Sequence, residues 1–340
     1  MKKINFCLFF VLTFLLFIFP VKAYNSWAVS HYAFVSGLIG VVCFFLIIGI
    51  VCLQKHDDWN FGSQRDSGEI KFGKKGKALP EYEAIKYFRD IPFEEDLAAF
   101  YWICLNYDIV LEAKLKKGLM GAIILKWIKE GKVSVVETAK GILDFKDNDY
   151  ALDLNNLKNI SDPVEKSFSE LLLKASSENN ILEANEFKKW CSYNHSELGD
   201  WFYFVKKSGL SSLKEKGYIT ASTEKVNGRY GSKRTIIVNN VSDKLWYEGL
   251  KIKGLKKFLL YFSLINEKEY FDVHLWEKYM IFSSLLNVTQ KFQEQFENLY
   301  PKINGDSIFD IDTINYGLGI AELGYISYEQ ECEEEVKKEE

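Results

Sequence analysis

The stretch Lys117–Glu137, KGLMGAIILKWIKEGKVSVVE, changes character at a single glycine. Before Gly131, apolar residues recur at the three- and four-residue spacing that places them on one face of an α-helix. Gly131 can adopt the left-handed conformation that ends a helix, and the β-branched residues after it favour a strand. Candidate partner strands lie at 141–145 and 150–154. Helices followed by a small hairpin are typical of a winged-helix unit.

A similar order of elements occurs again within residues 159–241. Pro163 stands where proline suits the first turn of a helix, and we expect further helices at 183–191 and 198–216. Asn227–Gly228 is a hairpin-turn dipeptide between two strand-like runs. The sequence therefore predicts a second winged-helix-like unit, although the two halves do not align residue by residue.

Two apolar runs stand near the start of the sequence. Residues 4–19 follow two lysines and precede a small residue, Ala23. This pattern favours a cleaved secretory signal peptide over an uncleaved first membrane helix. Ala33–Leu53 carries no charge and as a helix is long enough to cross a bilayer. The alternative, a buried core helix, is disfavoured because no polar face interrupts the run, so we expect a transmembrane helix at 33–53.

Basic residues indicate the orientation of that helix. Only Lys22 lies between the two apolar runs, whereas a group of lysines and one arginine follows between Lys55 and Lys77. The positive-inside rule then places the C-terminal part in the cytoplasm. We therefore expect a protein of the cell membrane, in contact with the lipid bilayer, with a large cytoplasmic domain.

The composition offers little catalytic chemistry. The six cysteines include no C-x-x-C pair, and none of the four histidines lies at a metal-ligating spacing. No G-x-S-x-G motif occurs. Glu94, Glu95 and Asp96 stand at the start of a predicted helix, where acidic residues favour the helix dipole, so we interpret them as capping residues. We therefore expect no enzyme activity, no cofactor and no metal site.

These patterns predict a mainly α-helical chain with small β-hairpins. An N-terminal transmembrane helix precedes a cytosolic tandem winged-helix-like domain and a C-terminal layer of helices. The expected boundaries are 1–23 for a signal peptide or first membrane helix, 33–53 for the transmembrane helix, 54–79 for a basic juxtamembrane linker, 80–158 and 159–241 for the two winged-helix-like units, 242–302 for the C-terminal helices, and 303–340 for a tail with a disordered, charged end at 331–340.

Several blocks of the sequence resemble the YciQ-like family of predicted bacterial membrane proteins. They are Tyr87–Pro92 (YFRDIP), Gly121–Val133 (GAIILKWIKEGKV), and Gly254–Leu259 (GLKKFL) together with Leu275–Tyr279 (LWEKY). The resemblance covers residues 80–301. It implies a winged-helix-like cytosolic region anchored by an N-terminal membrane segment. The family has no established activity, so the resemblance implies an architecture and no mechanism.

The function that we expect is protein interaction, signalling or scaffolding at the membrane, without catalysis. The candidate partner surface is an apolar groove around Leu275, Trp276 and Tyr279, although packing also accounts for these residues. The alternative is a membrane-tethered nucleic-acid-binding regulator, because basic residues on the last helix and wing of the second unit suit phosphate contacts. The helix is poor in Asn, Gln and Arg for base readout, and the net charge of −4 does not indicate nucleic acid. The candidate nucleic-acid contacts are Lys206, Lys207, Lys214, Arg229, Lys233 and Arg234.

Overall fold

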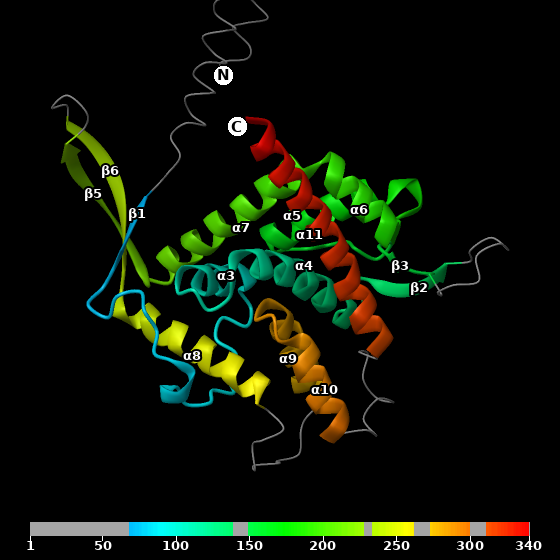
Figure 1. Cartoon of the computed structure of the whole chain (residues 1–340), viewed down its shortest axis with the longest axis horizontal. Coiled ribbons are helices and arrows are strands. Elements are labelled where there is room, and N and C mark those ends of the chain that lie inside the picture. Colours follow the sequence, from blue (N-terminus) through cyan, green and yellow to red (C-terminus); the bar gives the residue numbers. More distant parts are fainter. Residues whose placement is uncertain (1–67, 139–148, 228–232, 262–272, 300–310, 340) are drawn as a thin grey trace, which may run out of the picture. The chain divides into compact units, whose positions relative to one another are not determined.

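The computed structural model describes residues 68–138, 149–227, 233–261, 273–299 and 311–339 (Figure 1). This part of the chain is mainly helical with small sheets, as the sequence predicts. The elements are β1 Glu69–Phe72, α3 Leu97–Asn106, α4 Glu112–Lys129, β2 Ser134–Thr138, β3 Asp149–Asp153, α5 Pro163–Ala175, β4 Ile181–Glu183, α6 Ala184–Tyr193, α7 His195–Glu215, β5 Ile219–Asn227, β6 Lys233–Val241, α8 Asp243–Leu260, α9 Val273–Leu285, α10 Thr289–Leu299 and α11 Ile311–Glu339, with short 3₁₀ turns at Tyr82–Ala84 and Ser177–Asn179.

The prediction of a signal peptide and an N-terminal transmembrane helix needs correction. Both apolar runs, 4–19 and 33–53, lie outside the residues that the structure describes. Within the described ranges, no helix is both long and apolar enough to cross a membrane. The longer helices are interrupted by charges: α4, for example, carries lysines in its first and last turns, and charged residues are costly in a bilayer core.

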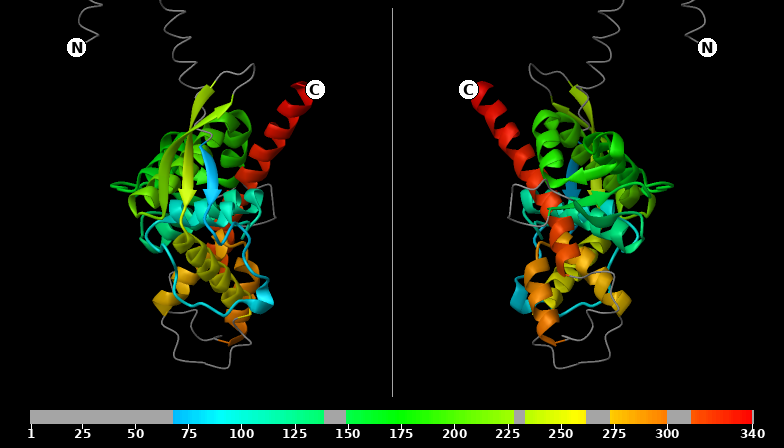
Figure 2. Two further views of the ribbon diagram at one scale, coloured as in Figure 1. Left: turned by 90° about the vertical axis from the view of Figure 1, so that its left-hand side faces the viewer. Right: turned by 90° about the vertical axis from the view of Figure 1, so that its right-hand side faces the viewer.

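Each of the two predicted hairpins gains a third strand from another part of the chain. β2 and β3 form the antiparallel hairpin of the first unit, and β4 from the second unit adds to β3 with Leu182 opposite Leu152. In the other sheet, β1 pairs in parallel with β6, and β5 completes the hairpin of the second unit. Figure 2 shows β1 beside the long β5–β6 hairpin. Each sheet therefore joins segments from both halves of the chain, and the expected linker 54–79 is wrong over 69–72, where β1 forms.

α4 lies at the centre of the helical part, with α3, α9 and α11 packed against it. Its residues from Leu119 to Leu125 are buried on every side, whereas the sequence predicts only one apolar face. Gly118 allows α4 and α9 to approach closely, because a Cβ atom at Gly118 would lie 2.3 Å from the carbonyl oxygen of Ser284 at the end of α9. The core is thus built around one helix whose middle turns are apolar all round.

α11 stands where the sequence predicts a tail with a disordered end. Its buried residues, among them Ile320 and Tyr325, face α4 and α6, and Figure 1 shows the helix crossing both. The charged end is held as well, because Ser192 Oγ donates to Glu331 at 2.6 Å. The prediction of disorder is wrong over 331–339, since it considered the charged residues alone and not the apolar stretch that docks the same helix.

Candidate protein-interaction surface

The predicted partner groove around Leu275, Trp276 and Tyr279 does not exist in the structure. Only Leu275 is exposed, at 37% of its surface, while Trp276 is 4% and Tyr279 1% exposed. The Trp276 ring packs against Phe292 of α10 with 5.0 Å between centroids. Trp276 and Tyr279 are therefore aromatic because they pack against α10 and α8, and the prediction of a partner surface there is wrong.

Three of the four blocks that carry the family resemblance meet at one structural junction. The Tyr279 hydroxyl donates to the backbone carbonyl of Arg89 at 2.8 Å, and its ring lies 5.4 Å from that of Phe258. The Phe88 N–H donates to the carbonyl of Gly254 at 3.3 Å. A Cβ atom at Gly254 would lie 2.8 Å from a backbone oxygen of this segment. YFRDIP, GLKKFL and LWEKY thus share a packing role.

The predicted nucleic-acid contacts fall into two groups. Lys206, Lys207 and Lys214 lie on α7, where the first two are exposed and Lys214 is half-buried. Among the described residues, no acidic side chain forms an ion pair with any of these lysines. Arg229 lies outside the described residues, and the structure describes Lys233 and Arg234 only through the backbone of β6. The structure therefore places the three predicted lysines on one helix, α7.

The exposed face of α7 also carries residues that sequence reasoning missed. Asp200, Tyr203 and Lys207 are exposed at spacings of three and four residues, which places them along one strip of the helix. Tyr203 is 58% exposed. We name Asp200, Tyr203, Lys206 and Lys207 the α7 stripe. The apolar periodicity of the opposite face could have revealed this strip, because it marks the residues between as solvent-facing.

The buried face of α7 rests on α5. The rings of Phe168 and Trp201 stack with 4.5 Å between centroids and 23° between planes. The Trp201 indole N–H donates to the backbone carbonyl of Val164 at 3.1 Å. A stacked pair with one directed hydrogen bond fixes the rotation of α7 about its axis, and this rotation decides which residues form the α7 stripe.

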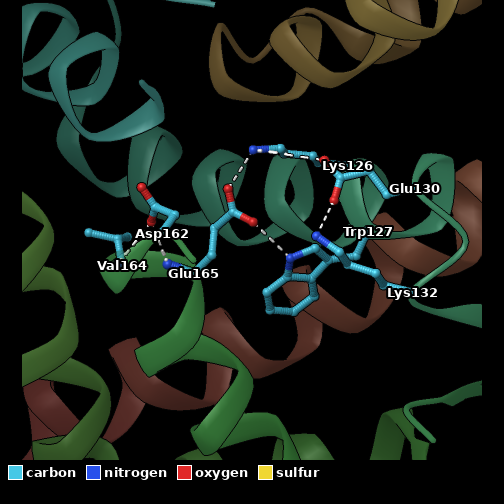
Figure 3. A network of polar contacts seen from close by, with 7 residues as sticks. All are labelled: Lys126, Trp127, Glu130, Lys132, Asp162, Val164 and Glu165. Atoms are coloured by element: carbon cyan, nitrogen blue, oxygen red, sulfur yellow. Dashed lines mark hydrogen bonds and ion pairs between the residues drawn. The ribbon is translucent and has the colours of Figure 1, made fainter. Parts of the chain in front are cut away.

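α5 is in turn fixed to α4 by a buried carboxylate (Figure 3). Glu165 accepts from Lys126 Nζ at 2.6 Å and from the Trp127 indole N–H at 2.9 Å. Burial lowers the pKa of the Lys126 ammonium, but the hydrogen bond and the charge of Glu165 outweigh this, so the pKa lies above its ordinary value. Loss of either partner would leave a poorly solvated charge, which is costly.

The C-terminal end of α7 is held by Asp96, the N-cap of α3. Asp96 accepts from the Ala99 N–H at 2.8 Å and from Ser212 Oγ at 2.5 Å, and it pairs with Lys216. Burial raises the pKa of Asp96, but these donors outweigh it and hold the pKa below its ordinary value. The interpretation of Asp96 as a capping residue is confirmed. Gly209 lets α7 cross α3 closely, because a Cβ there would lie 2.2 Å from the carbonyl oxygen of Ala98.

Cys104, Cys191 and His195 have structural roles. In the described ranges, no three His, Cys, Asp or Glu side chains gather in a way that could hold a metal ion. Burial raises the pKa of the Cys104 and Cys191 thiols, so both behave as small apolar residues. His195 Nε2 lies 2.8 Å from Glu335 Oε1, which joins α7 to the charged end of α11.

Comparisons with known proteins do not place the chain in a family. The similarity to the YciQ-like family therefore stays a prediction from the quoted blocks. No protein-family model matches this sequence, and a search of curated proteins found no match either.

Proposed function

We propose that this chain is a non-catalytic protein-interaction module, and that its partner binds the α7 stripe. The observation that carries the proposal is the 58% exposure of Tyr203 on a helix that is held by Asp96 at one end and packed on α5 through Trp201. A pre-ordered helix loses little conformational freedom on binding. Tyrosine is enriched among the residues that dominate binding energy at protein interfaces.

The charges of the α7 stripe favour a protein partner. Lys206 and Lys207 offer cations without an ion-pair partner among the described residues, and Asp200 offers a carboxylate on the same strip. A partner that presents a carboxylate to the lysines and a cation to Asp200 would match both signs. Such charge patterns contribute specificity more than affinity.

Nucleic acid is the second candidate for the same surface. It is supported by the position of Lys206 and Lys207 on the helix that precedes the β5–β6 hairpin, as in a winged helix. Asp200 opposes it, because a carboxylate on the same strip repels phosphates. Phosphate contacts would also make binding fall steeply as the salt concentration rises.

Site-directed photo-crosslinking in the native cell tests the proposal. A photoreactive phenylalanine analogue replaces Tyr203 in the full chain, and the same analogue at Tyr247 of α8, which is 48% exposed, serves as the control. We expect a protein adduct at position 203 that survives nuclease and disappears in the Asp200→Lys and Lys207→Glu variants. A nuclease-sensitive adduct would favour nucleic acid instead. Equal adducts at both positions, or none at 203, would contradict the proposal.

A further inference from the structure

A cleft of about 900 Å³ opens between α4, α11 and the turn that joins α9 to α10. Its volume lies within the range of ligand-binding sites in proteins. Its lining includes four uncharged amide side chains and two residues of each charge, Lys117, Lys291, Glu294 and Glu322. The polar lining residues that could contact a ligand include Asn287, Gln290, Gln293, Asn315, Lys117 and Glu322.

The first turn of α10 faces this cleft, since Thr289, Gln290 and Lys291 all line it. Among the described residues, the backbone N–H groups of these positions have no acceptor. The first N–H groups of a helix lack intrahelical partners, and they carry the positive end of the helix dipole. A helix start of this kind suits an anionic group such as a carboxylate.

Gln293 gives an independent indication of a ligand. Only 8% of this residue is exposed, yet it lines the cleft and its amide has no hydrogen-bond partner among the described residues. The Gln293 amide is not among the fully enclosed polar atoms that lack a partner in the described residues, so it is open to the cleft. A largely buried residue whose amide is open to a polar cleft is suited to bind a polar ligand.

The wall of the cleft formed by α4 and α11 carries a paired cation and anion. Lys117 Nζ of α4 lies 2.6 Å from Glu322 Oε1 of α11, and both residues line the cleft. A ligand with a carboxylate and an ammonium group would find a partner for each. A ligand with several phosphates would meet the carboxylates of Glu322 and Glu294, which also lines the cleft, and this disfavours a polyanion.

We propose that the cleft binds a short peptide with free ends. Its carboxylate lies at the first turn of α10 and at Lys117, and its ammonium group lies at Glu322. Gln293, Asn287 and Asn315 bond its peptide groups, since a side-chain amide both donates and accepts as a peptide group does. Capture of a terminal carboxylate by backbone N–H groups is a known mode of peptide recognition. This proposal does not depend on the α7 stripe.

Calorimetric titration of the full chain with trialanine tests this inference. We expect saturable binding at millimolar peptide or below. Amidation of the carboxyl end should weaken it by about tenfold, the effect of one lost hydrogen bond to a charged group, and acetylation of the amino end should weaken it less. Inorganic phosphate should not displace the peptide. Absence of saturable binding, or equal affinity for trialanine and its amide, would overturn the proposal.

Variants separate ligand binding from folding. Lys117→Met should bring the affinities of free and amidated trialanine together, while Lys117→Glu combined with Glu322→Lys keeps an ion pair and should reverse the order of the two end-blocked peptides. Gln293→Leu should weaken binding by about tenfold and leave the thermal midpoint nearly unchanged, because the Gln293 amide makes no hydrogen bond to the described residues. A lower midpoint with unchanged affinity would show that Gln293 is structural and would contradict its assigned role.

Discussion

Tyr279 on α9 and Tyr203 on α7 belong to the same helical assembly and have opposite surroundings. Tyr279 is 1% exposed between α8 and α10, whereas Tyr203 is 58% exposed on the outer strip of α7. α9 is covered on its sides by other helices, but α7 packs through one face only. The comparison shows that neighbouring elements, and not residue type, decide whether an aromatic side chain is available to a partner.

The largest expected effect is a difference in stability between these two tyrosines. Tyr279→Ala should lower the free energy of unfolding by about 3–5 kcal/mol, because it leaves a cavity and removes the hydrogen bond to Arg89. Tyr203→Ala should change it by less than about 0.5 kcal/mol. Urea denaturation of both variants measures this, and similar losses in the two would break the comparison.

The next largest effect on stability is expected at Glu165, which fixes α5, the helix beneath α7, to α4. Glu165→Gln should lower the free energy of unfolding by about 2 kcal/mol, since Lys126 loses its 2.6 Å partner and keeps only Glu130 at 4.0 Å. The matched control is Glu224→Gln, which breaks the exposed pair with Lys71 and should have a much smaller effect, because exposed ion pairs contribute little to stability. If both variants unfold at the same urea concentration, the buried carboxylate does not hold α5 to α4.

A smaller, pH-dependent effect is expected at Asp96. Its pKa is held below the ordinary value of 3.8, so its ionised form stabilises the fold above that pH, and this contribution is lost as the pH falls through the folded-state pKa. Asp96→Asn keeps a capping residue but lacks the charge. The variant should be about 1 kcal/mol less stable than wild type at pH 7, and the gap should close as the pH falls below 3.8. A pH-independent gap would contradict the assignment.

The smallest effect is expected where α11 meets α7. The pKa of His195 lies above its ordinary value of 6.5, because the Ser192 carbonyl and Glu335 favour the charged ring. The stabilisation is therefore complete below pH 6.5 and is lost as the pH rises through the folded-state pKa. Amide exchange in the last turns of α11, corrected for intrinsic rates, should be slower at pH 6 than at pH 8. Glu335→Gln should remove this difference, and a difference that persists would exclude the His195 contact as its cause.

Local signals in the sequence predict most of the helices. Pro163 begins α5 and Gly131 follows the end of α4, as expected, whereas the predicted Asn227–Gly228 turn extends beyond the described residues and Asn227 itself ends β5. These signals act over a few residues, so they are visible in a linear chain. The α7 lysines were predicted for the same reason, since their spacing places them on one helix.

Long-range packing was not predictable in the same way. The pairing of β1 with β6 joins residues on either side of both units, and no short pattern in β1 specifies that partner. The burial of Trp276 depends on Phe292 of the next helix, which periodicity within α9 cannot indicate. The periodicity of α7 marks Tyr203 as solvent-facing, but no local pattern indicates whether a solvent-facing tyrosine binds a partner.

Hydroxyl-radical footprinting of the full chain, alone and in native cell extract, tests the central claim most directly. We predict that Tyr203 reacts in the isolated protein and is protected in nuclease-treated extract, that Tyr247 reacts in both, and that Tyr279 reacts in neither. Protection of Tyr203 only before nuclease treatment would assign the α7 stripe to nucleic acid. A reactive Tyr203 in every sample, or a reactive Tyr279 in the isolated protein, would contradict the account.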